Sequence, residues 1–448
     1  MIDLLEIGEK AIKIAEKLNV SEAEAYLTQN TSRYCLLSNR LDVAKTSISS
    51  GFGIRIIIDK KIGIHGITSL KDKDVEKAVE KAVKIAKASD PDPDFKELNK
   101  KHGRTSVSGI YDKEIAEMDV EKIIEAANTM ITSAIDYDEV VQPTRGILEA
   151  STWRIGICNS HGIEAEREGT AINIWFRCKA KSGGKEASAS ESKQARRWKD
   201  VDFPEIATSA ASKAVSILDA TLIESQKLPV IWQNKFTASM IGVMFGGTID
   251  AYSVQKNRSP WKDKIGQQVA SENFNLIDDG TLEAGFRTRP FDDEGIATRK
   301  TPVVENGVLK GFLYDTYTAN KEGKESTGNA FRSYNSVPLP APSNLLLKPG
   351  DAEREEIIEE TKKGLLVVDT IGEWLSNPVS GEMSATVVVG YLIENGEIKK
   401  PVKGIMISGN FHHIIKQEIE LIGKDITNIG GIYAPTIKIR EMTIAGKA

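Results

Sequence analysis

The chain has 448 residues and a mass of 49.1 kDa, which at about 150 residues per domain suggests two to four domains. Hydrophobic residues make up 40% and charged residues 27%, proportions typical of a folded globular protein and not of a disordered chain. The net charge is −5 and no run of Lys or Arg exceeds two residues, so no nucleic-acid partner is expected. Acidic residues at the start, no apolar run of about 20 residues and only three cysteines predict a cytoplasmic protein without a membrane segment or disulfides.

The first part of the chain predicts a helix, a strand meander and a second helix. Apolar residues recur at helical spacing in its first and last segments, and the segments between them alternate or form short apolar runs. These elements are expected, in chain order, at 4–18, 22–37, 54–58, 62–67 and 75–86. A cluster with two prolines at 89–94 ends the second helix, and the polar stretch to Ser108 is interpreted as a linker.

The same order of elements then repeats, which favours a duplicated α/β unit. Helices are expected at 119–135 and 203–218, and strands between them at 146–158, 163–168 and 171–180. From Leu228 onward glycine-bearing strands dominate, with helices expected at 235–245, 352–363 and 411–421 and a hairpin around Asn395-Gly396. The predicted fold class is therefore α+β: small α/β units at 1–105 and 106–225, followed by a large, mainly antiparallel β-rich domain at 226–448.

No complete catalytic motif is present in the sequence. The five histidines lack the spacing of a helical metal site, and neither HExxH nor GxSxG occurs. All three cysteines lie in predicted strands, where a buried structural role is favoured. The glycines Gly242, Gly246 and Gly247 favour close packing or a helix end. The acidic clusters Asp278-Asp279 and Asp292-Asp293-Glu294 could bind Mg²⁺ or act as acid and base, although a solvated turn is favoured.

Several segments of the C-terminal half resemble the TldD/PmbA family, also called modulators of DNA gyrase. Their order and spacing over about 200 residues carry the resemblance, and they are Phe291–Gly295, Val304–Gly311, Thr327–Arg332, Pro342–Asn344, Lys348–Gly350 and Ile407–Asn410. The TldD arm of this family carries an H-E-x-x-x-H zinc motif with a cysteine as third ligand. There the resemblance implies a zinc ion that activates water, with the Glu as general base.

This chain departs from that motif at every position. Counted back without gaps from Val254–Ser259, the two histidine positions are Gly242 and Gly247, and the glutamate position is Val243. The cysteine position falls near Ile422. The pattern resembles the PmbA/TldE arm, whose members are thought to pair with a zinc-bearing TldD-type subunit. The chain itself is therefore expected to bind no zinc and no other cofactor.

The resemblance implies a catalytically silent subunit, in a heterodimer or with itself, that helps to process flexible cytoplasmic peptides. An extended peptide would add to a sheet edge, and Asn329, Arg332 and Asn410 are candidates for lining the groove. Two alternatives remain open at this point. One is an autonomous hydrolase that uses Asp292, Asp293 and Glu294, and the other is a homodimeric, non-enzymatic protein-binding module that acts on a protein such as gyrase.

Overall fold

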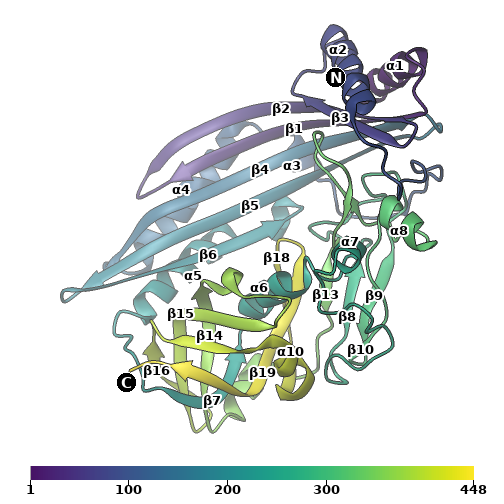
Figure 1. The fold of residues 1–448 in the computed structure, drawn as a ribbon. Coiled ribbons are helices and arrows are strands. Elements are labelled where there is room, and N and C mark those ends of the chain that lie inside the picture. Colours follow the sequence, from purple (N-terminus) through teal and green to yellow (C-terminus); the bar gives the residue numbers. More distant parts are fainter. Residues whose placement is uncertain (1, 448) are drawn as a thin grey trace.

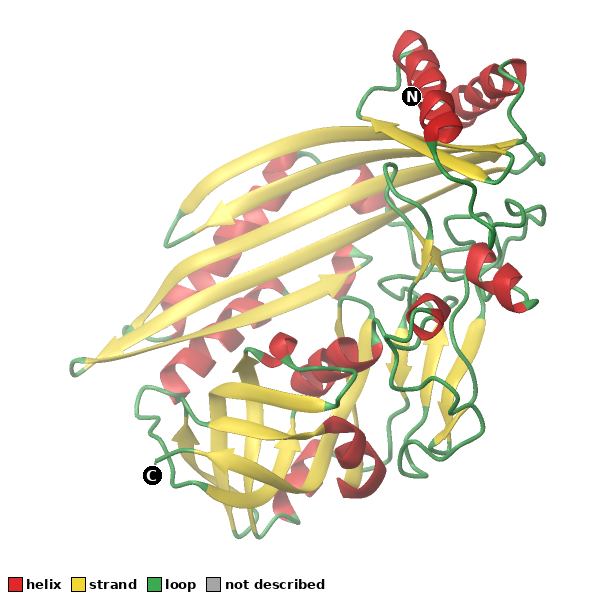
Figure 2. Cartoon of the chain, viewed as in Figure 1, coloured by secondary structure: helices red, strands yellow, loops and turns green. Residues whose placement is uncertain are grey.

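Two sheets organise the chain in this computed structural model, which describes residues 2–447 (Figure 1). A long, curved, six-stranded sheet is built from the first half of the chain, and the second half forms an eleven-stranded sheet beside it. One set of helices lies against the first sheet, and the others accompany the strands and loops of the second half (Figure 2). The predicted fold class, α+β with a β-rich C-terminal half, is confirmed.

The first sheet is antiparallel throughout and has the strand order β3-β2-β1-β4-β5-β6. Its strands are β1 (Glu22–Leu37), β2 (Leu41–Ile58), β3 (Lys61–Ile67), β4 (Val141–Asn159), β5 (Glu164–Ser182) and β6 (Lys185–Ala195). Strands β1 and β4 pair along their length, from Glu24 opposite Asn159 to Leu37 opposite Gly146. The two predicted α/β units therefore share one continuous sheet.

Five helices accompany the first sheet: α1 (Leu4–Lys17), α2 (Asp72–Ala88), α3 (Lys113–Glu117), α4 (Val120–Tyr137) and α5 (Phe203–Ser216). Each of the two helix pairs, α1 with α2 and α4 with α5, buries an apolar stripe against the sheet. Aspartate side chains accept from backbone N–H groups at several of their N-termini; Asp3 caps α1 and Asp202 caps α5. The polar stretch up to Ser108, interpreted as a linker, docks on the C-terminal half, where the Gly103 N–H donates to Gly295 O and the Thr105 N–H donates to Pro290 O.

Five strands of the C-terminal half close into a barrel, because β7 pairs with both β14 and β19. The barrel strands are β7 (Gln226–Trp232), β14 (Lys363–Ile371), β15 (Glu382–Glu394), β17 (Met406–Asn410) and β19 (Ile432–Ala445). The other strands are β8 (Leu276–Asp279), β9 (Lys300–Glu305), β10 (Val308–Leu309), β11 (Ala330–Phe331), β12 (Leu339–Pro340), β13 (Leu345–Leu347), β16 (Glu397–Val402) and β18 (Ile419–Ile429).

Helix α6 (Asn234–Phe245) packs against β19, β18 and β14 and supplies aromatic residues to the barrel core. Phe236 contacts Trp232 and Phe245 contacts Phe411, in each case edge to face. The remaining helices are short: α7 (Ala251–Gln255), α8 (Thr316–Glu322), α9 (Arg354–Glu359) and α10 (Phe411–His413). In the described range, 2–447, no helix combines the length and the apolar character needed to cross a membrane.

The structure corrects four of the predicted elements. The strands expected at 163–168 and 171–180 form one strand, β5, and the following strand β6 was not predicted. The helix expected at 352–363 ends at Glu359, and β14 begins at Lys363. The helix expected at 411–421 is three residues of α10 and a π-helical segment, Ile414–Glu418, after which β18 begins. Pairing with distant strands overrides local helical periodicity at both places.

Candidate functional site

The four degenerate motif positions lie on two elements that pack together, α6 and β18. Gly242 and Val243 lie on the half-buried face of α6, Gly246 is its C-terminal cap, and Gly247 is the exposed residue that follows. Ile422 is buried in β18, opposite Ile437 of β19. The predicted helix end at Gly246-Gly247 is confirmed, whereas close packing is not the reason for Gly247, because a Cβ there would meet no atom within 4 Å.

Strand β6 forms the edge of the first sheet that lies nearest to α6 and the barrel (Figure 1). Within residues 2–447 it pairs with β5 only, so its other edge carries no strand. The backbone of Ser192 on this edge is bonded to side chains: its N–H donates to Glu191 Oε1 at 2.7 Å, and its C=O accepts from Lys235 Nζ at 3.3 Å. Residues two apart on a strand direct their backbone groups to the same edge, so Ser190 and Gln194 face outward as well.

A polar cluster from three elements surrounds this point of the edge. The carboxylate of Glu191 accepts from Ser209 Oγ at 3.0 Å and from Lys213 Nζ at 2.8 Å, both on α5, and it is paired with Lys235 of α6. Burial lowers the pKa of Lys213, and it lowers the pKa of Lys235 to about 8, while the nearby charge of Asp369 opposes both shifts. Two ammonium groups and two carboxylates thus meet at the middle of β6.

Two hollows lie along β6, one on either side of this cluster, between the sheet edge and the barrel. One, of about 490 Å³, lies between Glu186–Ser188 and the β15 segment Thr386–Val388. The other, of about 230 Å³, lies between Lys193–Arg196 and the β18 residues Ile426–Asn428. The Gln194 side chain also accepts from Gly430 N in the β18–β19 turn. We call this surface the β6 groove.

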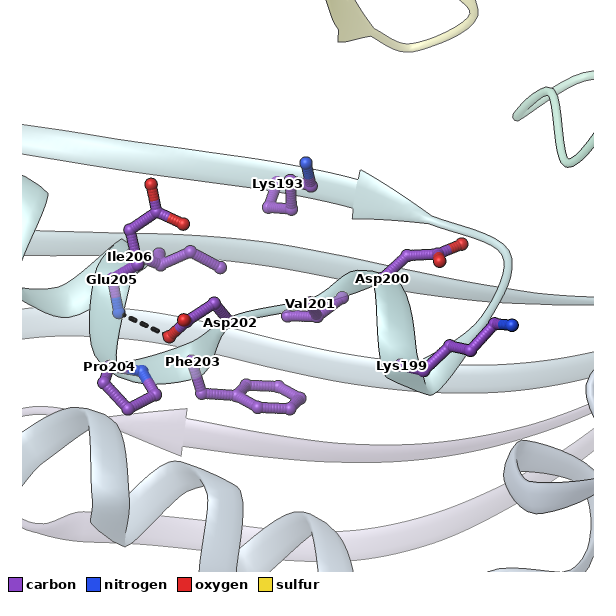
Figure 3. A pocket seen from close by; sticks show the side chains of 9 residues that line it. All are labelled: Lys193, Lys199, Asp200, Val201, Asp202, Phe203, Pro204, Glu205 and Ile206. Carbon is purple, nitrogen blue, oxygen red and sulfur yellow. Dashed lines mark hydrogen bonds between the residues drawn. The ribbon is translucent and has the colours of Figure 1, made fainter.

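A further hollow of about 450 Å³ lies beneath the end of β6, where Lys193 faces the segment Lys199–Ile206 (Figure 3). The polar groups at the start of α5 are already bonded there, since Asp202 accepts from the backbone N–H of Glu205 at 2.9 Å. This hollow lies on the helix-bearing side of the sheet, and we assign no ligand to it.

The acidic cluster Asp292-Asp293-Glu294 is buried, with each residue at most 2% exposed, and the favoured prediction of a solvated turn is wrong. Three buried arginines pair with it: Arg55 of β2, Arg167 of β5, and Arg289 of the C-terminal half. A fourth, Arg332 of the C-terminal half, joins the two halves of the chain through Glu24 of β1. Asp293 pairs with Arg167 and lies 3.6 Å from Arg289. Glu24 of β1 pairs with Arg332 and, at 2.8 Å, with Arg55. We call these residues the interdomain ionic cluster.

Burial dominates the titration of this cluster. It raises the pKa of Glu294 to about 8, with the charge of Asp315 adding to the shift and Arg55 opposing it. It also raises the pKa of Asp292 to about 6 and that of the nearby Asp278 to about 7. A carboxyl group with a raised pKa binds its proton more tightly in the folded protein than in the unfolded chain. Its contribution to stability is complete below the unfolded pKa and is lost as the pH rises through the folded pKa.

We therefore expect Glu294→Gln to flatten the pH dependence of stability between pH 4.5, the ordinary pKa of Glu, and pH 8. The amide mimics the protonated acid, so the variant gains stability relative to the wild type as the pH rises, by up to about 1.4 kcal/mol per pH unit. Urea unfolding at several pH values in this window measures the difference. Glu305→Gln, at an exposed pair with Lys310, is the control and should follow the wild type. Parallel curves for Glu294→Gln and the wild type would contradict this assignment.

The three predicted groove residues do not lie in the β6 groove. Asn329 is buried and donates to Asp278 Oδ2 at 2.7 Å and to Ala341 O. The Arg332 side chain is fully buried in the interdomain ionic cluster. Asn410 is exposed, accepts from His413 N at 3.1 Å as the cap of α10, and donates to Ser380 O. The structure therefore brings Asn329 and Arg332 into the acidic region but leaves Asn410 apart from both.

Histidines and cysteines do not assemble into a site. His412 packs on Trp261 with ring centroids 4.9 Å apart, its neighbour His413 is exposed, and His161 Nε2 lies 2.7 Å from Glu22. Cys35, Cys158 and Cys178 lie buried in strands as predicted, and burial raises their thiol pKa values to about 11, 12 and 12. Among residues 2–447, no three His, Cys, Asp or Glu side chains are grouped so that they could hold a metal ion.

Glu191, Lys213 and Lys235 were not among the predicted site residues, and β6, which carries Glu191, was not predicted as a strand. That strand alternates small residues, with Ala187 and Ala189 facing the helices, and lacks the β-branched residues typical of strands. The signal that could have revealed it is Gly183-Gly184, whose positive φ angles of 56° and 77° form the turn between β5 and β6.

Comparisons with known proteins match the whole architecture. Family models described as domain 1, the central domain and the C-terminal domain of PmbA/TldA metallopeptidases match residues 23–86, 113–218 and 225–446. An uncharacterized protein of Methanocaldococcus jannaschii is 30% identical over 96% of this chain and 97% of its own length. The crystal structure of TldE from Thermococcus kodakarensis has a TM-score of 0.90 at 26% identity and covers 98% of this chain and 99% of that one.

A Thermotoga maritima protein described as a candidate modulator of a DNA gyrase is similar as well. It has a TM-score of 0.88 at 29% identity, covering 99% of this chain and 100% of that one. These likenesses extend from end to end and include both the long sheet and the barrel. The chain therefore belongs to the PmbA/TldD metallopeptidase family.

Proposed function

We propose that this chain is the non-catalytic, PmbA/TldE-like subunit of a cytoplasmic TldD-type zinc metallopeptidase and that it holds flexible peptides for cleavage by the zinc-bearing subunit. The observation that carries the proposal is the β6 groove, where a strand-free sheet edge faces the helix with the degenerate motif. Three free, buried cysteines suit a reducing compartment.

An unpaired sheet edge binds extended peptides through backbone hydrogen bonds, largely without regard to sequence. The β6 edge lies in a groove between two hollows, so an added strand would contact both the sheet and the barrel wall. Most strands of a folded protein are already paired within its own sheets, so this geometry favours unfolded or flexible substrates. The likeness to TldE supports assignment to the same arm of the family.

The motif positions support the absence of zinc chemistry in this subunit. Zinc in proteins is held by Cys, His, Asp or Glu side chains, and Gly242, Gly247, Val243 and Ile422 offer none of these donors. The required zinc would come from a TldD-type partner in a heterodimer, and self-association is the alternative assembly. Against an autonomous hydrolase stands the burial of Asp292, Asp293 and Glu294, which leaves these acids out of reach of a substrate.

Metal content tests the proposal directly. We expect inductively coupled plasma mass spectrometry to find no stoichiometric zinc in the purified chain and about one zinc per pair after co-purification with a TldD-type subunit. We also expect only the pair to cleave an unstructured peptide. Stoichiometric zinc in the isolated chain, or peptide cleavage by it that survives removal of metal, would overturn the proposal.

A further inference from the structure

The polar cluster at the middle of the β6 groove has the chemistry of a carboxylate-binding site whose present occupant is the chain's own Glu191. This inference rests on the proposed peptide-binding function and assigns a ligand group to the same groove. Glu191 is 9% exposed, and its carboxylate receives four donors: the backbone N–H of Ser192, Ser209 Oγ, Lys213 Nζ and Lys235 Nζ. Charged donors of this kind make the strongest hydrogen bonds to a carboxylate.

The same side chains also bind the outward backbone groups of Ser192 on the unpaired edge of the sheet. Glu191 takes the outward N–H of Ser192, and Lys235 takes its outward C=O. These are the two groups that a neighbouring strand would use, so an incoming peptide has to displace both side chains. Release of Glu191 from this cluster would free the Ser192 N–H and the two ammonium groups together.

We propose that Ser209, Lys213 and Lys235 bind a carboxylate of an extended peptide, and that Glu191 fills this site until the peptide displaces it. The exchange leaves the charge of the pocket unchanged, because one carboxylate replaces another beside the two lysines and Asp369. The peptide backbone pairs with Ser192 at the same time. Since Lys235 begins α6, the bound carboxylate lies at the first turn of the helix that carries Gly242.

Isothermal titration of the full chain with three matched, flexible octapeptides tests the site. One has a free C-terminal carboxylate and no acidic side chain, the second is its C-terminal amide, and the third is the amide with one internal Glu. We expect the free acid to bind roughly tenfold more tightly than the plain amide. The third peptide shows whether the bound carboxylate can also come from a side chain. Tight binding of this peptide would assign the site to acidic side chains as well as to the C-terminus.

Variants connect that preference to the named residues. Lys213→Gln and Lys235→Gln keep a hydrogen-bond donor but remove the charge, and each should bring the binding of acid and amide to within about threefold. Glu191→Ala empties the site and should tighten binding of the free acid more than that of the amide. Lys181→Met, an exposed lysine of β5, is the control and should keep the full preference. Circular dichroism confirms that each variant is folded.

The outcomes separate this inference from the proposed function. Equal binding of acid and both amides by the wild type, or a preference that survives both lysine substitutions, overturns the carboxylate site. If the amide nevertheless binds and is lost when the β6 edge is blocked, the peptide groove stands without it. If no peptide binds the chain or its complex, both the carboxylate site and the groove fail.

Discussion

Replacement of Arg332 with Met is expected to lower the free energy of unfolding by about 3–5 kcal/mol, the cost of removing one partner from a buried ion pair. The Arg332 and Glu24 side chains are both 0% exposed, and after the replacement Glu24 would keep its ion pair with Arg55 at 2.8 Å. Methionine has no donor to replace the guanidinium. Because Glu24 belongs to the first sheet, the loss should also weaken the docking of the sheet on the C-terminal half.

Urea unfolding followed by circular dichroism measures this effect. Arg354→Met is the matched control, because Arg354 pairs with Glu355 at the surface with side chains 39% and 64% exposed. Such exposed pairs contribute about 0–1 kcal/mol, and the control should change little. If Arg332→Met stays within about 1 kcal/mol of the wild type, the interdomain ionic cluster does not hold the two halves together.

A proline at Ser190 is expected to reduce the affinity of the chain for extended peptides about tenfold. Proline removes the outward N–H of the β6 edge, and its ring hinders the approach of a second strand; one such hydrogen bond is worth about 0.5–1.5 kcal/mol. The pairing of β6 with β5 should survive, since proline is tolerated on an edge strand when its missing N–H faces away from the sheet. Titration with an amidated octapeptide measures the loss.

Ser190→Ala separates the backbone from the side chain in this test, because it keeps the outward N–H. Peptide binding by this variant should match the wild type, and both variants should unfold at similar urea concentrations. Unchanged binding by Ser190→Pro would place the peptide elsewhere and remove the observation on which the proposed function depends.

The first half of the fold could be predicted in large part from the sequence, because its signals are local. The apolar stripes of α1, α2, α4 and α5 and the alternation in β1 are visible in one pass along the chain. The barrel could not be predicted in this way. It closes through β7 and β19, which lie at opposite ends of the C-terminal half, and no local pattern encodes such a pairing.

The candidate site likewise combines residues that local sequence patterns could place and residues that only the fold brings together. Gly242 and Val243 of the degenerate motif could be placed on a helix from the sequence, whereas Ile422 lies in β18, a strand where the sequence predicts the end of a helix. The β6 groove could not be predicted, because Glu191, Lys213 and Lys235 come from three elements and meet only after folding. The burial of the acidic segment 292–294 was not predicted for a related reason: its three arginine partners, Arg55, Arg167 and Arg289, are scattered over the sequence.

The pairing of β1 with β4 has a consequence for any attempt to divide the chain. A fragment that begins after the first unit would expose the edge of β4 from Gly146 to Asn159, which β1 now covers. A long, regular and unprotected edge is a template for intermolecular strand pairing. We therefore expect such a fragment to aggregate instead of folding alone. The predicted units 1–105 and 106–225 should be inherited together, expressed together and unfolded together.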